Sequence, residues 1–412
     1  MENKKSFDDM NFIEKLKATG PAWMSAGLNV GGATVTNSVI LAAATGYMYG
    51  WVFAFAVLAS YFAIFACVRL TIVTDKNPVA LIREKINPAF AWIVAMAVLI
   101  SNVIFFTIQI SLLGDVFESI IPGVSFKIGM VIAIIVAGII ISIPGKSAND
   151  VIQKSIQLMI YFLTASYIIS LFIVDINWGD LFRGITKFSL PKNKAEVLLF
   201  TAVLGSALPI NAPFMQAYAT KSSKYDASDL KLFKFETIIT SLFLLFVQIA
   251  VLIVVTSTLY IRGIQPTSAI EAGAALEPFA GKLSTILFAL GMGGAALSTM
   301  IANTSIQAYI MTDLLQWEVD PRTKKFKMIQ LIMLLVGFTI PIFGWNAYSV
   351  ASWGGAFNSL FMPFGILAWF ILNNNKDLMG KYKTSILANL GIILALVISS
   401  LTAIRFIYVN FL

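Results

Sequence analysis

The sequence predicts an all-α integral membrane protein with eleven transmembrane helices. Three observations lead to this class. Hydrophobic residues make up 58% of the 412 residues and charged residues only 12%, about half the charged share of a soluble protein. The apolar residues form runs long enough to cross a bilayer. Two of these runs, five spans apart, are interrupted by polar and helix-breaking residues, which is typical of transporters built from inverted repeats.

Composition excludes several other classes. The net charge of +8 comes from short basic clusters between apolar runs, so it does not indicate nucleic-acid binding. The one cysteine, Cys67, lies within a span, which excludes a disulfide framework and a cysteine metal site. The absence of His removes the usual imidazole ligand and the side chain that titrates near neutral pH. The polar start of the chain, residues 1–19, lacks a signal-peptide pattern, and we expect it to be cytoplasmic.

Uncharged runs give the boundaries of the expected helices. The run from Met328 to Asn375 is too long for one span, and Pro341, Gly344 and Asn346 predict a turn at 341–348 that divides it in two. The other runs occupy residues 21–48, 50–68, 86–114, 128–145, 155–174, 197–220, 237–261, 283–312 and 384–404. Together these runs predict eleven helices of roughly 20 residues each.

Basic residues predict the orientation. If the N-terminus is cytoplasmic, 21 of the 29 Lys and Arg residues lie inside, in segments 1–20, 69–85, 146–154, 221–234, 322–327 and 376–383. Eight lie outside, where an even split would place half. The sequence therefore predicts a multi-pass protein of the cell membrane with a cytoplasmic N-terminus. An odd number of helices then places the C-terminus outside.

The first span contains a polar interruption. Between Gly27 and Ser38 it carries Asn29, Gly31, Gly32, Thr34 and Asn37. Adjacent glycines weaken a helix, so we expect a break at Gly31–Gly32. Freed backbone groups are tolerated at membrane depth only where they line a cavity or are buried in protein. This stretch therefore predicts one half of a binding site.

The sixth span contains the matching interruption. Within Thr201–Ala217, Pro209 and Pro213 each remove a backbone donor, and Gly205, Ser206 and Asn211 add polarity. The alternative is an ordinary proline kink. Broken helices at positions 1 and 6 favour two inverted five-helix repeats with a substrate between the breaks.

The repeat hypothesis divides the chain into four parts. Residues 1–19 form a cytoplasmic segment, and 20–175 form the first repeat, helices 1–5. Residues 176–375 form the second, inverted repeat, helices 6–10. Residues 376–412 contain helix 11 and the C-terminus.

Gly20-Pro21, Gly46-Tyr47 and Arg69-Leu-Thr-Ile-Val-Thr-Asp-Lys76 resemble, in order and spacing, motifs of the Nramp (natural resistance-associated macrophage protein) family of divalent metal-ion transporters. Leu276-Glu-Pro, Leu287-Phe-Ala-Leu-Gly291 and Leu378-Met-Gly380 resemble its later motifs. The resemblance covers nearly the whole chain. It implies the leucine-transporter fold and transport of an inorganic cation, most plausibly divalent.

The departures from the family fall on the site itself. Where the family has Asp-Pro-Gly-Asn in helix 1, this chain has Gly31-Gly32-Ala33-Thr34, and where the family has Met-Pro-His in helix 6, it has Leu208-Pro209-Ile210. Gly355 stands near the family's helix 10 Gln. The acidic residues that the family keeps in helix 3 are replaced by Asn102, Thr107 and Gln109. The resemblance therefore implies the fold but not the metal ligands.

The expected site consists of backbone carbonyls with small and amide side chains. Its residues are Asn29, Gly31, Gly32, Ala33, Thr34, Asn37, Ser206, Leu208, Pro209, Ile210 and Asn211. Transition metals prefer imidazole, thioether or carboxylate ligands, and a dehydrated divalent ion without a compensating anion is costly in a membrane. A hydrated, non-transition ion such as Mg²⁺ fits better, because Mg²⁺ dehydrates reluctantly. No metal ligand is certain.

A neutral or zwitterionic organic solute, such as an amino acid, is the alternative cargo, with Na⁺ as its coupling ion. In helix 8, Ser298 and Thr299 resemble the sodium-site hydroxyls of the leucine-transporter fold; packing of small residues is the other interpretation. Proton coupling ranks lower, because no span carries a titratable group at mid-depth.

The sequence predicts a transporter, not an enzyme, with no resident cofactor. The expected partners are the bilayer and a small solute or cation, without nucleic acid, and we expect the monomer to function. A sensor or scaffold is a third alternative. The short cytoplasmic segments disfavour it.

Overall fold

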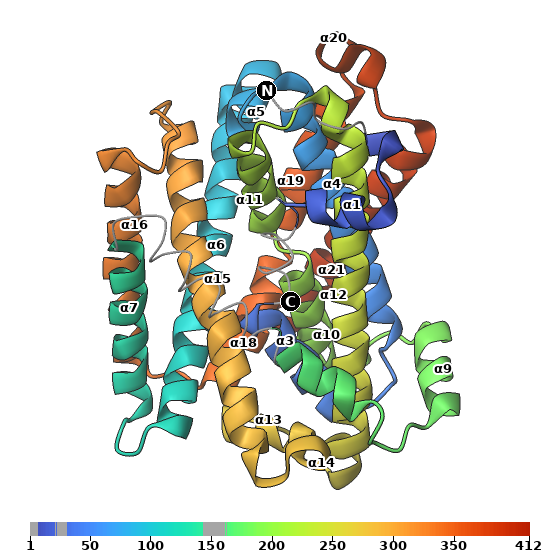
Figure 1. The fold of residues 1–412 in the computed structure, drawn as a ribbon, viewed down its shortest axis with the longest axis vertical. Helices are drawn as coiled ribbons and strands as arrows, with labels where there is room; N and C mark the ends of the chain where they lie inside the picture. The colour runs from blue at the N-terminus through green and yellow to red at the C-terminus, as the bar shows by residue number, and fades with distance from the viewer. Residues whose placement is uncertain (1–6, 21, 23–30, 143–160, 162) are drawn as a thin grey trace.

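The computed structural model describes residues 7–20, 22, 31–142, 161 and 163–412, and all regular elements in these ranges are helical (Figure 1). Eight helices in this part of the chain are long and apolar enough to cross a membrane. They span Trp51–Thr74, Pro88–Ile120, Lys194–Ser222, Ala227–Arg262, Ala269–Leu314, Lys324–Phe343, Ala347–Asn374 and Ile386–Phe411. The predicted all-helical membrane class is confirmed.

Two further predicted spans are represented by shorter apolar helices. Helix α3 (Gly32–Thr45) is the second half of predicted helix 1, and α7 (Phe126–Ser142) corresponds to helix 4. Predicted helix 5, residues 155–174, lies partly outside the described residues, and 163–170 are helical. The expected turn at 341–348 is present. The short helix α17 (Ile340–Phe343) ends at Gly344, whose φ of 61° favours glycine.

The sixth span is broken where its sequence predicts. Helix α10 (Lys194–Ala207) ends before Pro209, and α11 (Asn211–Ser222) begins two residues after it. Pro209 has no N–H to continue the helix ladder. Pro213 does not break α11, because it lies in the first turn, where a backbone N–H has no partner within the helix.

A further interruption, at a position where no break was predicted, divides the tenth span. Helix α18 (Ala347–Asn358) and α19 (Met362–Asn374) are separated by Ser359–Phe361. The N–H groups of these three residues bond three residues back, to Ala356, Phe357 and Asn358. This tighter turn keeps the backbone hydrogen-bonded while the chain changes direction.

The helices pack in two groups. In the first, α6 (Pro88–Ile120) contacts α7 and α15 (Ser284–Leu314), and α15 contacts α16 (Lys324–Gly337). In the second, α4 (Trp51–Thr74) contacts α11 and α12 (Leu230–Thr258), while α3 contacts α10 and α12. Figure 1 shows α7 and α16 at one side of the bundle and α12 toward the other. Each group contains matching helices from both predicted repeats.

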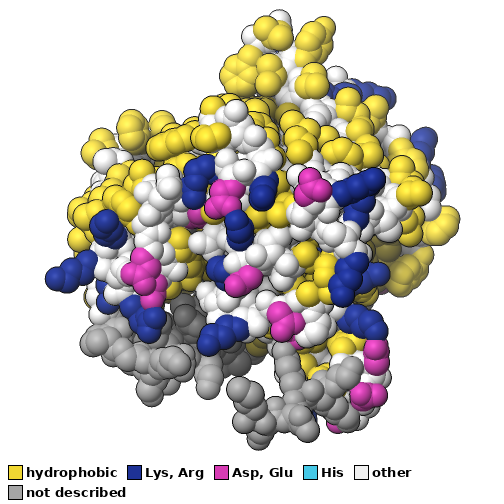
Figure 2. Space-filling model, turned by 90° about the horizontal axis from the view of Figure 1, so that it is seen from above, with side chains coloured by type: hydrophobic (Ala, Val, Ile, Leu, Met, Phe, Trp, Pro, Cys, Tyr) yellow, Lys and Arg dark blue, Asp and Glu magenta, His cyan; other side chains and the backbone are white. Residues whose placement is uncertain are grey.

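Short helices lie at the two ends of the bundle. One end carries α1 (Phe12–Ala18), α5 (Pro78–Lys85) and α20 (Lys376–Met379), and the opposite end carries α9 (Trp178–Thr186), α13 (Ala269–Gly273) and α14 (Glu277–Ala280) (Figure 1). Figure 2 looks onto the first end, where Lys and Arg side chains are spread among fewer acidic ones. The last helix, α21 (Ile386–Phe411), packs on α4 and α19.

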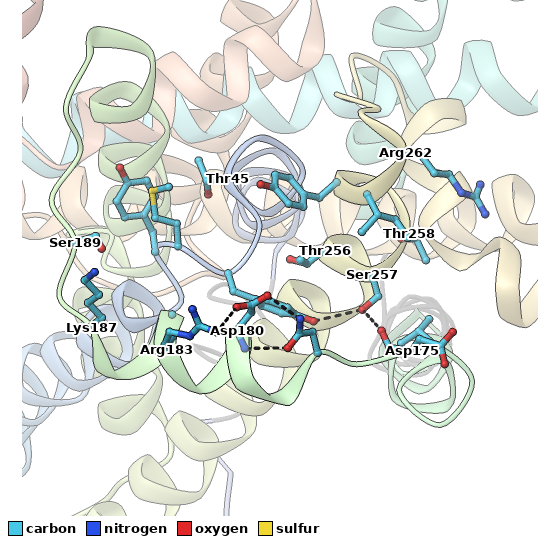
Figure 3. A pocket seen from close by; sticks show the side chains of 18 of the residues that line it. Thr45, Asp175, Asp180, Arg183, Lys187, Ser189, Thr256, Ser257, Thr258 and Arg262 are labelled. Carbon is cyan, nitrogen blue, oxygen red and sulfur yellow. Dashed lines mark hydrogen bonds and ion pairs between the residues drawn. The ribbon is translucent and has the colours of Figure 1, made fainter.

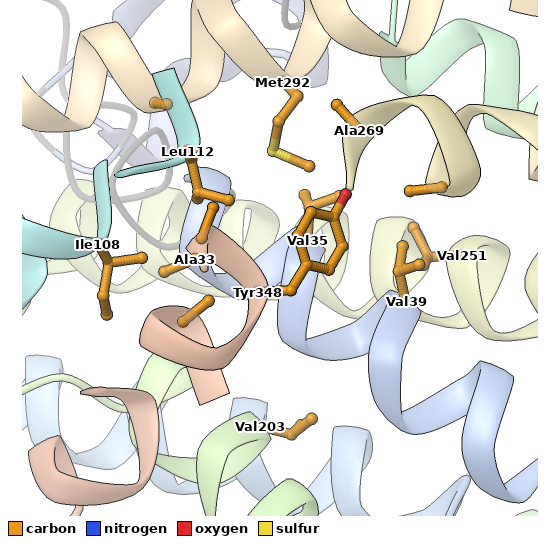
Figure 4. Packing of buried hydrophobic residues seen from close by; sticks show 14 of the residues in the cluster. Ala33, Val35, Val39, Ile108, Leu112, Val203, Val251, Ala269, Met292 and Tyr348 are labelled. Carbon is orange, nitrogen blue, oxygen red and sulfur yellow. The ribbon is translucent and has the colours of Figure 1, made fainter. Parts of the chain in front are cut away.

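Helix α3 lies at the centre of the main hydrophobic core. Val35 and Val39 are buried among residues from several other helices, including Leu112, Met292 and Tyr348 (Figure 4). Almost every described residue of α3 is buried, so its polar side chains are held inside the protein rather than in lipid.

Helices α10 and α18 approach at van der Waals distance of their backbones. A Cβ on Gly205 would lie 1.9 Å from the carbonyl oxygen of Gly355 and 2.9 Å from the Ser359 nitrogen. Both obstacles are backbone atoms, which cannot rotate away. Gly205 is therefore required by the packing of these two helices.

We predict that Gly205→Ala destabilises the protein by about 1–3 kcal/mol, the usual cost of overpacking a core. Thermal unfolding of the purified protein in detergent, followed by tryptophan fluorescence, measures the effect. Gly138→Ala in α7 is the control, because its nearest neighbour, a Leu334 methyl group, lies 3.7 Å away. Equal melting temperatures for the two variants would contradict this account of the α10–α18 contact.

Candidate functional site

The start of α3 lies inside the bundle, where the first predicted half-site was expected. Gly31 is the N-cap in an extended conformation, and Gly32 is the first helical residue. Ala33, Thr34 and Asn37 follow within two turns, and all five are buried. Asn29, the remaining predicted residue of this half-site, lies outside the described residues.

Two side chains of α3 bond to neighbouring helices. The Thr34 hydroxyl donates to the carbonyl oxygen of Ser206 at 2.9 Å, joining the start of α3 to the end of α10. The Asn37 amide donates to the carbonyl oxygen of Ala351 in α18 at 3.1 Å. A positive helix N-terminus therefore lies beside a negative helix C-terminus, which is a favourable arrangement of dipoles. The structure brings Thr34 and Ser206 together as the two-break hypothesis requires.

Leu208, Pro209 and Ile210 form the buried link between α10 and α11. They contribute backbone and apolar side chains rather than polar ligands. Leu208 also lines a very small cavity with Ser359 and Met362, so the breaks of the sixth and tenth spans are neighbours.

Asn211, the first residue of α11, joins a buried network of amide side chains. Its Nδ2 donates to Oδ1 of Asn102 in α6 at 3.2 Å and to Oδ1 of Asn303 in α15 at 3.5 Å. Asn102 in turn donates to the Asn303 carbonyl oxygen at 2.6 Å and to Oε1 of Gln307 at 2.9 Å. We call these four residues the amide cluster. It joins the start of α11 to both α6 and α15.

Asn303 and Gln307 were missed in the sequence. They lie four residues apart, and therefore on one face of α15, within a long apolar run. Two carboxamides on one face of a membrane span are the signal that would have identified them. Asn102, Asn211 and Asn303 are at most 3% exposed, so their polar atoms depend on one another for hydrogen bonds.

Gln109 lies on α6 close to the start of α3. A Cβ on Gly32 would be 2.8 Å from its Oε1, so Gly32 is what allows this approach. The side chain is fully buried, and neither amide atom has a hydrogen-bond partner. Gln109 and Asn102 are seven residues apart, about 10 Å along the helix. Helix α6 therefore presents one carboxamide to each break.

Gly355 lies against the first half-site, where α18 contacts α3 and α10. A Cβ there would lie 2.6 Å from Nδ2 of Asn37 and 2.8 Å from the Ala202 carbonyl oxygen. The residue that resembles a family ligand position by sequence is thus a packing glycine between α3, α10 and α18.

The predicted sodium residues lie in the middle of α15. Thr299 is buried and donates its hydroxyl to the Ala295 carbonyl oxygen within the helix, and Ser298 is half-buried. Ala296 and Met292 contact α3, at Gly32 and Thr36. Thr299, three residues beyond Ala296, shares this face of the helix.

The buried carboxylates lie near helix ends, as expected. Asp115 accepts a bond from the Ala269 N–H at 2.6 Å, and Glu236 accepts one from the Gly20 N–H at 2.9 Å. Asp313 accepts bonds from the Tyr218 hydroxyl at 2.7 Å and the Val79 N–H. These contacts attach short segments at the ends of the bundle. Within the described ranges no three His, Cys, Asp or Glu residues group as metal ligands.

A separate cavity of about 1080 Å³ opens at the end that carries α9 (Figure 3). Thr45, the last residue of α3, lines it, so it lies about 20 Å from the start of that helix. In it Asp180 pairs with Arg183 at 3.1 Å, and Ser257 donates to the Asp175 carbonyl oxygen. Both acidic and basic side chains line this cavity.

Comparison with known proteins identifies the fold family. The model of the family "Natural resistance-associated macrophage protein-like", or Nramp, matches residues 22–409. The chain belongs to the Nramp family. Its relatives include proteins named divalent metal cation transporter MntH from Erwinia tasmaniensis, 24% identical over 94% of this chain and 93% of the relative, and from Yersinia pestis, 22% identical over 94% of each.

Solved structures agree on the fold. A manganese transporter of Eremococcus coleocola superposes with a TM-score of 0.74 at 14% identity, covering 98% of this chain and 92% of that one. MhsT in complex with L-phenylalanine superposes with a TM-score of 0.64 at 14% identity, covering 96% and 99%. The chain is thus a multi-pass membrane protein of an Nramp transporter fold, and its family consists of transporters rather than enzymes.

Within this Nramp fold, the described site offers amides, hydroxyls and backbone carbonyls. Such groups bind water, a hydrated ion or a polar solute by hydrogen bonds and do not supply a fixed negative charge. The arrangement can therefore hold and orient a cargo, but its chemistry differs from that of a transition-metal site.

Proposed function

We propose that this Nramp-family protein is a secondary transporter of a divalent cation that keeps part of its water shell, with Mg²⁺ as the best candidate. The observation that carries the proposal is the amide cluster, together with Gln109, beside the two broken helices. Membership of the family and the names of the MntH relatives support a divalent cation. The ligand chemistry supports a hydrated one.

Carboxamides suit a hydrated ion because they can both accept hydrogen bonds from water and donate hydrogen bonds to it. The carbonyl oxygen of Asn or Gln accepts hydrogen bonds from metal-bound water, and the NH₂ group donates to the second shell. Mn²⁺ and Fe²⁺ gain more from nitrogen, sulfur or carboxylate ligands than Mg²⁺ does. Replacing those ligands by amides therefore shifts preference toward the ion that retains its waters.

Alternating access is supported by the two helix groups. Within the α3, α10 and α12 group, the Thr34–Ser206 bond holds the half-helices together. Between groups, the contacts include the Gln109–Gly32 approach, the amide cluster and the Thr36–Met292 contact of α3 with α15. We infer that rocking of one group against the other opens the site to each side in turn, within eleven helices and with 20–175 and 176–375 as the two repeats.

We further propose that the end with α1, α5 and α20 is cytoplasmic, as the basic residues indicate (Figure 2). The buried Cys67 can be replaced by Ser to give a cysteine-free background. In intact cells, Lys187→Cys should react with a membrane-impermeant maleimide, while Lys381→Cys should react only after lysis. The reverse pattern would overturn the orientation.

A Na⁺-coupled carrier of a zwitterionic solute is the second candidate. The start of α3 favours it, because no side chain caps this helix N-terminus and such an end suits a carboxylate. A thermal-stability screen separates the candidates, since specific binding raises the melting temperature by mass action. Stabilisation by amino acids but not by Mg²⁺ would support the second candidate.

For sodium, we predict that Ser298→Ala combined with Thr299→Ala removes any dependence of transport on Na⁺. The reason is that both hydroxyls are expected to coordinate the ion beside the Ala296 contact with α3. Uptake is measured in proteoliposomes with Na⁺ or choline outside. Equal uptake by the wild-type protein with Na⁺ and with choline outside would contradict the proposed sodium site.

For cargo, we predict that proteoliposomes containing the protein take up Mg²⁺ at millimolar concentrations, while micromolar Mn²⁺ is not accumulated. Fluorescent indicators for each ion in the lumen measure both fluxes. Thr34→Ala combined with Asn211→Ala should reduce Mg²⁺ uptake at least tenfold, because it removes polar groups from both half-sites.

Two results would contradict this prediction. Rapid Mn²⁺ uptake at micromolar concentration would show that the site does not need fixed negative charge or soft ligands. Mg²⁺ uptake unchanged by the double substitution would show that the site lies elsewhere. Asn389→Ala, in a half-buried amide pair with Asn374 at 3.0 Å, is the control for loss of an amide outside the site.

A further inference from the structure

The start of α3 is an electropositive helix end buried in the protein. The helix has fourteen residues, and no side chain caps it. The N–H groups of Thr34 and Val35 already bond to the Gly31 carbonyl oxygen, at 3.0 and 3.2 Å. The outermost donors are therefore those of Gly32 and Ala33, which by helix geometry point out of the helix end.

A second observation independently points to a ligand at this place. The Gln109 carboxamide reaches Gly32 from α6, is fully buried, and has no hydrogen-bond partner at either amide atom. An unpaired buried carboxamide costs several kcal/mol in a membrane protein, and a ligand bound at the helix end offsets that cost for Gln109. The atom of this carboxamide nearest Gly32 is the acceptor Oε1. A half-turn of the terminal amide exchanges it for the NH₂ group, which adds two donors to those of the helix end.

The two other described side chains nearest to Gly32 are apolar. The Leu112 and Ala296 side chains lie 3.1 and 3.2 Å from the Gly32 Cβ position, and Leu112 lies beside Ala33 in Figure 4. Apolar side chains beside the helix end strengthen electrostatic interactions there. Backbone donors, a carboxamide and apolar side chains are suitable surroundings for a small hydrogen-bond acceptor.

We propose that the N-terminal end of α3, together with Gln109, binds a small anion, either chloride or the carboxylate of a small solute. This inference rests on the proposed cation transport and completes its charge balance. The described site has no carboxylate, so a divalent cation there is uncompensated. An anion at the helix end offsets part of that charge, and the two ions enter the site together.

Cation and anion binding are then thermodynamically coupled. The factor by which the anion raises the affinity for Mg²⁺ equals the factor by which Mg²⁺ raises the affinity for the anion. Couplings of this kind usually lie between about 5-fold and 150-fold. We expect the apparent dissociation constant for Mg²⁺ to fall about tenfold between a chloride-free buffer and 150 mM chloride.

The experiment measures Mg²⁺ affinity by thermal shift on the purified, full-length protein. Sodium is constant, and chloride replaces isethionate, a bulkier sulfonate. A third series uses acetate, which separates a halide site from a carboxylate site. Chloride without any divalent cation is titrated in parallel, so that the anion site is tested independently of the cation.

Three variants locate the effect. Gln109→Ala should lose the chloride dependence of Mg²⁺ affinity. Gln109→Glu, which is nearly isosteric, should bind Mg²⁺ tightly in all three salts, because it supplies a fixed carboxylate. Gln248→Ala is the matched control, since Gln248 in α12 is also buried with both amide atoms unpartnered, and it should keep the wild-type chloride dependence.

The outcomes are distinct. Equal wild-type Mg²⁺ affinity in all three salts overturns the anion site and leaves cation transport standing. Chloride stabilisation that Gln109→Ala abolishes and Gln248→Ala retains supports the anion site, even if no divalent cation binds and the proposed transport fails. Chloride dependence that survives in Gln109→Ala overturns the assignment to the start of α3.

Discussion

The structure depends on one constraint, which is that a polar group buried in a membrane protein must find a partner inside the protein. In the described part of the chain, the sixth and tenth spans are interrupted and α3 begins inside the bundle, and each of these helix ends exposes backbone groups that helices normally satisfy. The Thr34–Ser206 bond joins two of the exposed ends, and tight turns satisfy the third. Around them the amide cluster fills the space with groups that bond to each other. A site built in this way keeps hydrogen-bonding capacity and gives up fixed charge.

Much of this arrangement could be predicted from the sequence, because proline and paired glycines act locally. Pro209 marks the break between α10 and α11, and Gly31–Gly32 marks the start of α3. The interruption of the tenth span was missed although it has a local signal: Pro363, in the first turn of α19, lacks an N–H and its ring disfavours a continuous helix through Ser359. Asn303 and Gln307 were missed because their partners are nearly 100 to 200 residues away in the chain. Contacts at that distance depend on the fold rather than on local patterns.

The fold and the ligand set give different information about the cargo. Membership of the Nramp family indicates how the helices are arranged and which general class of solute crosses the membrane. The side chains at the breaks determine which member of that class is bound, because binding depends on charge, softness and hydration. Gly355, which only packs, shows that alignment of a position does not transfer its role. The site must therefore be judged from its own residues.

The central claim is that the cation is bound through its water shell by uncharged groups. Cobalt(III) hexaammine tests it directly, because this complex resembles hexahydrated Mg²⁺ in size and shape but does not exchange its ligands. We predict that it competes with Mg²⁺ for the purified protein, and that Asn211→Ala and Gln109→Ala weaken Mg²⁺ and the complex in parallel. Mg²⁺ binding that is unaffected by saturating cobalt hexaammine would show that the ion is dehydrated in the site, and would contradict the account.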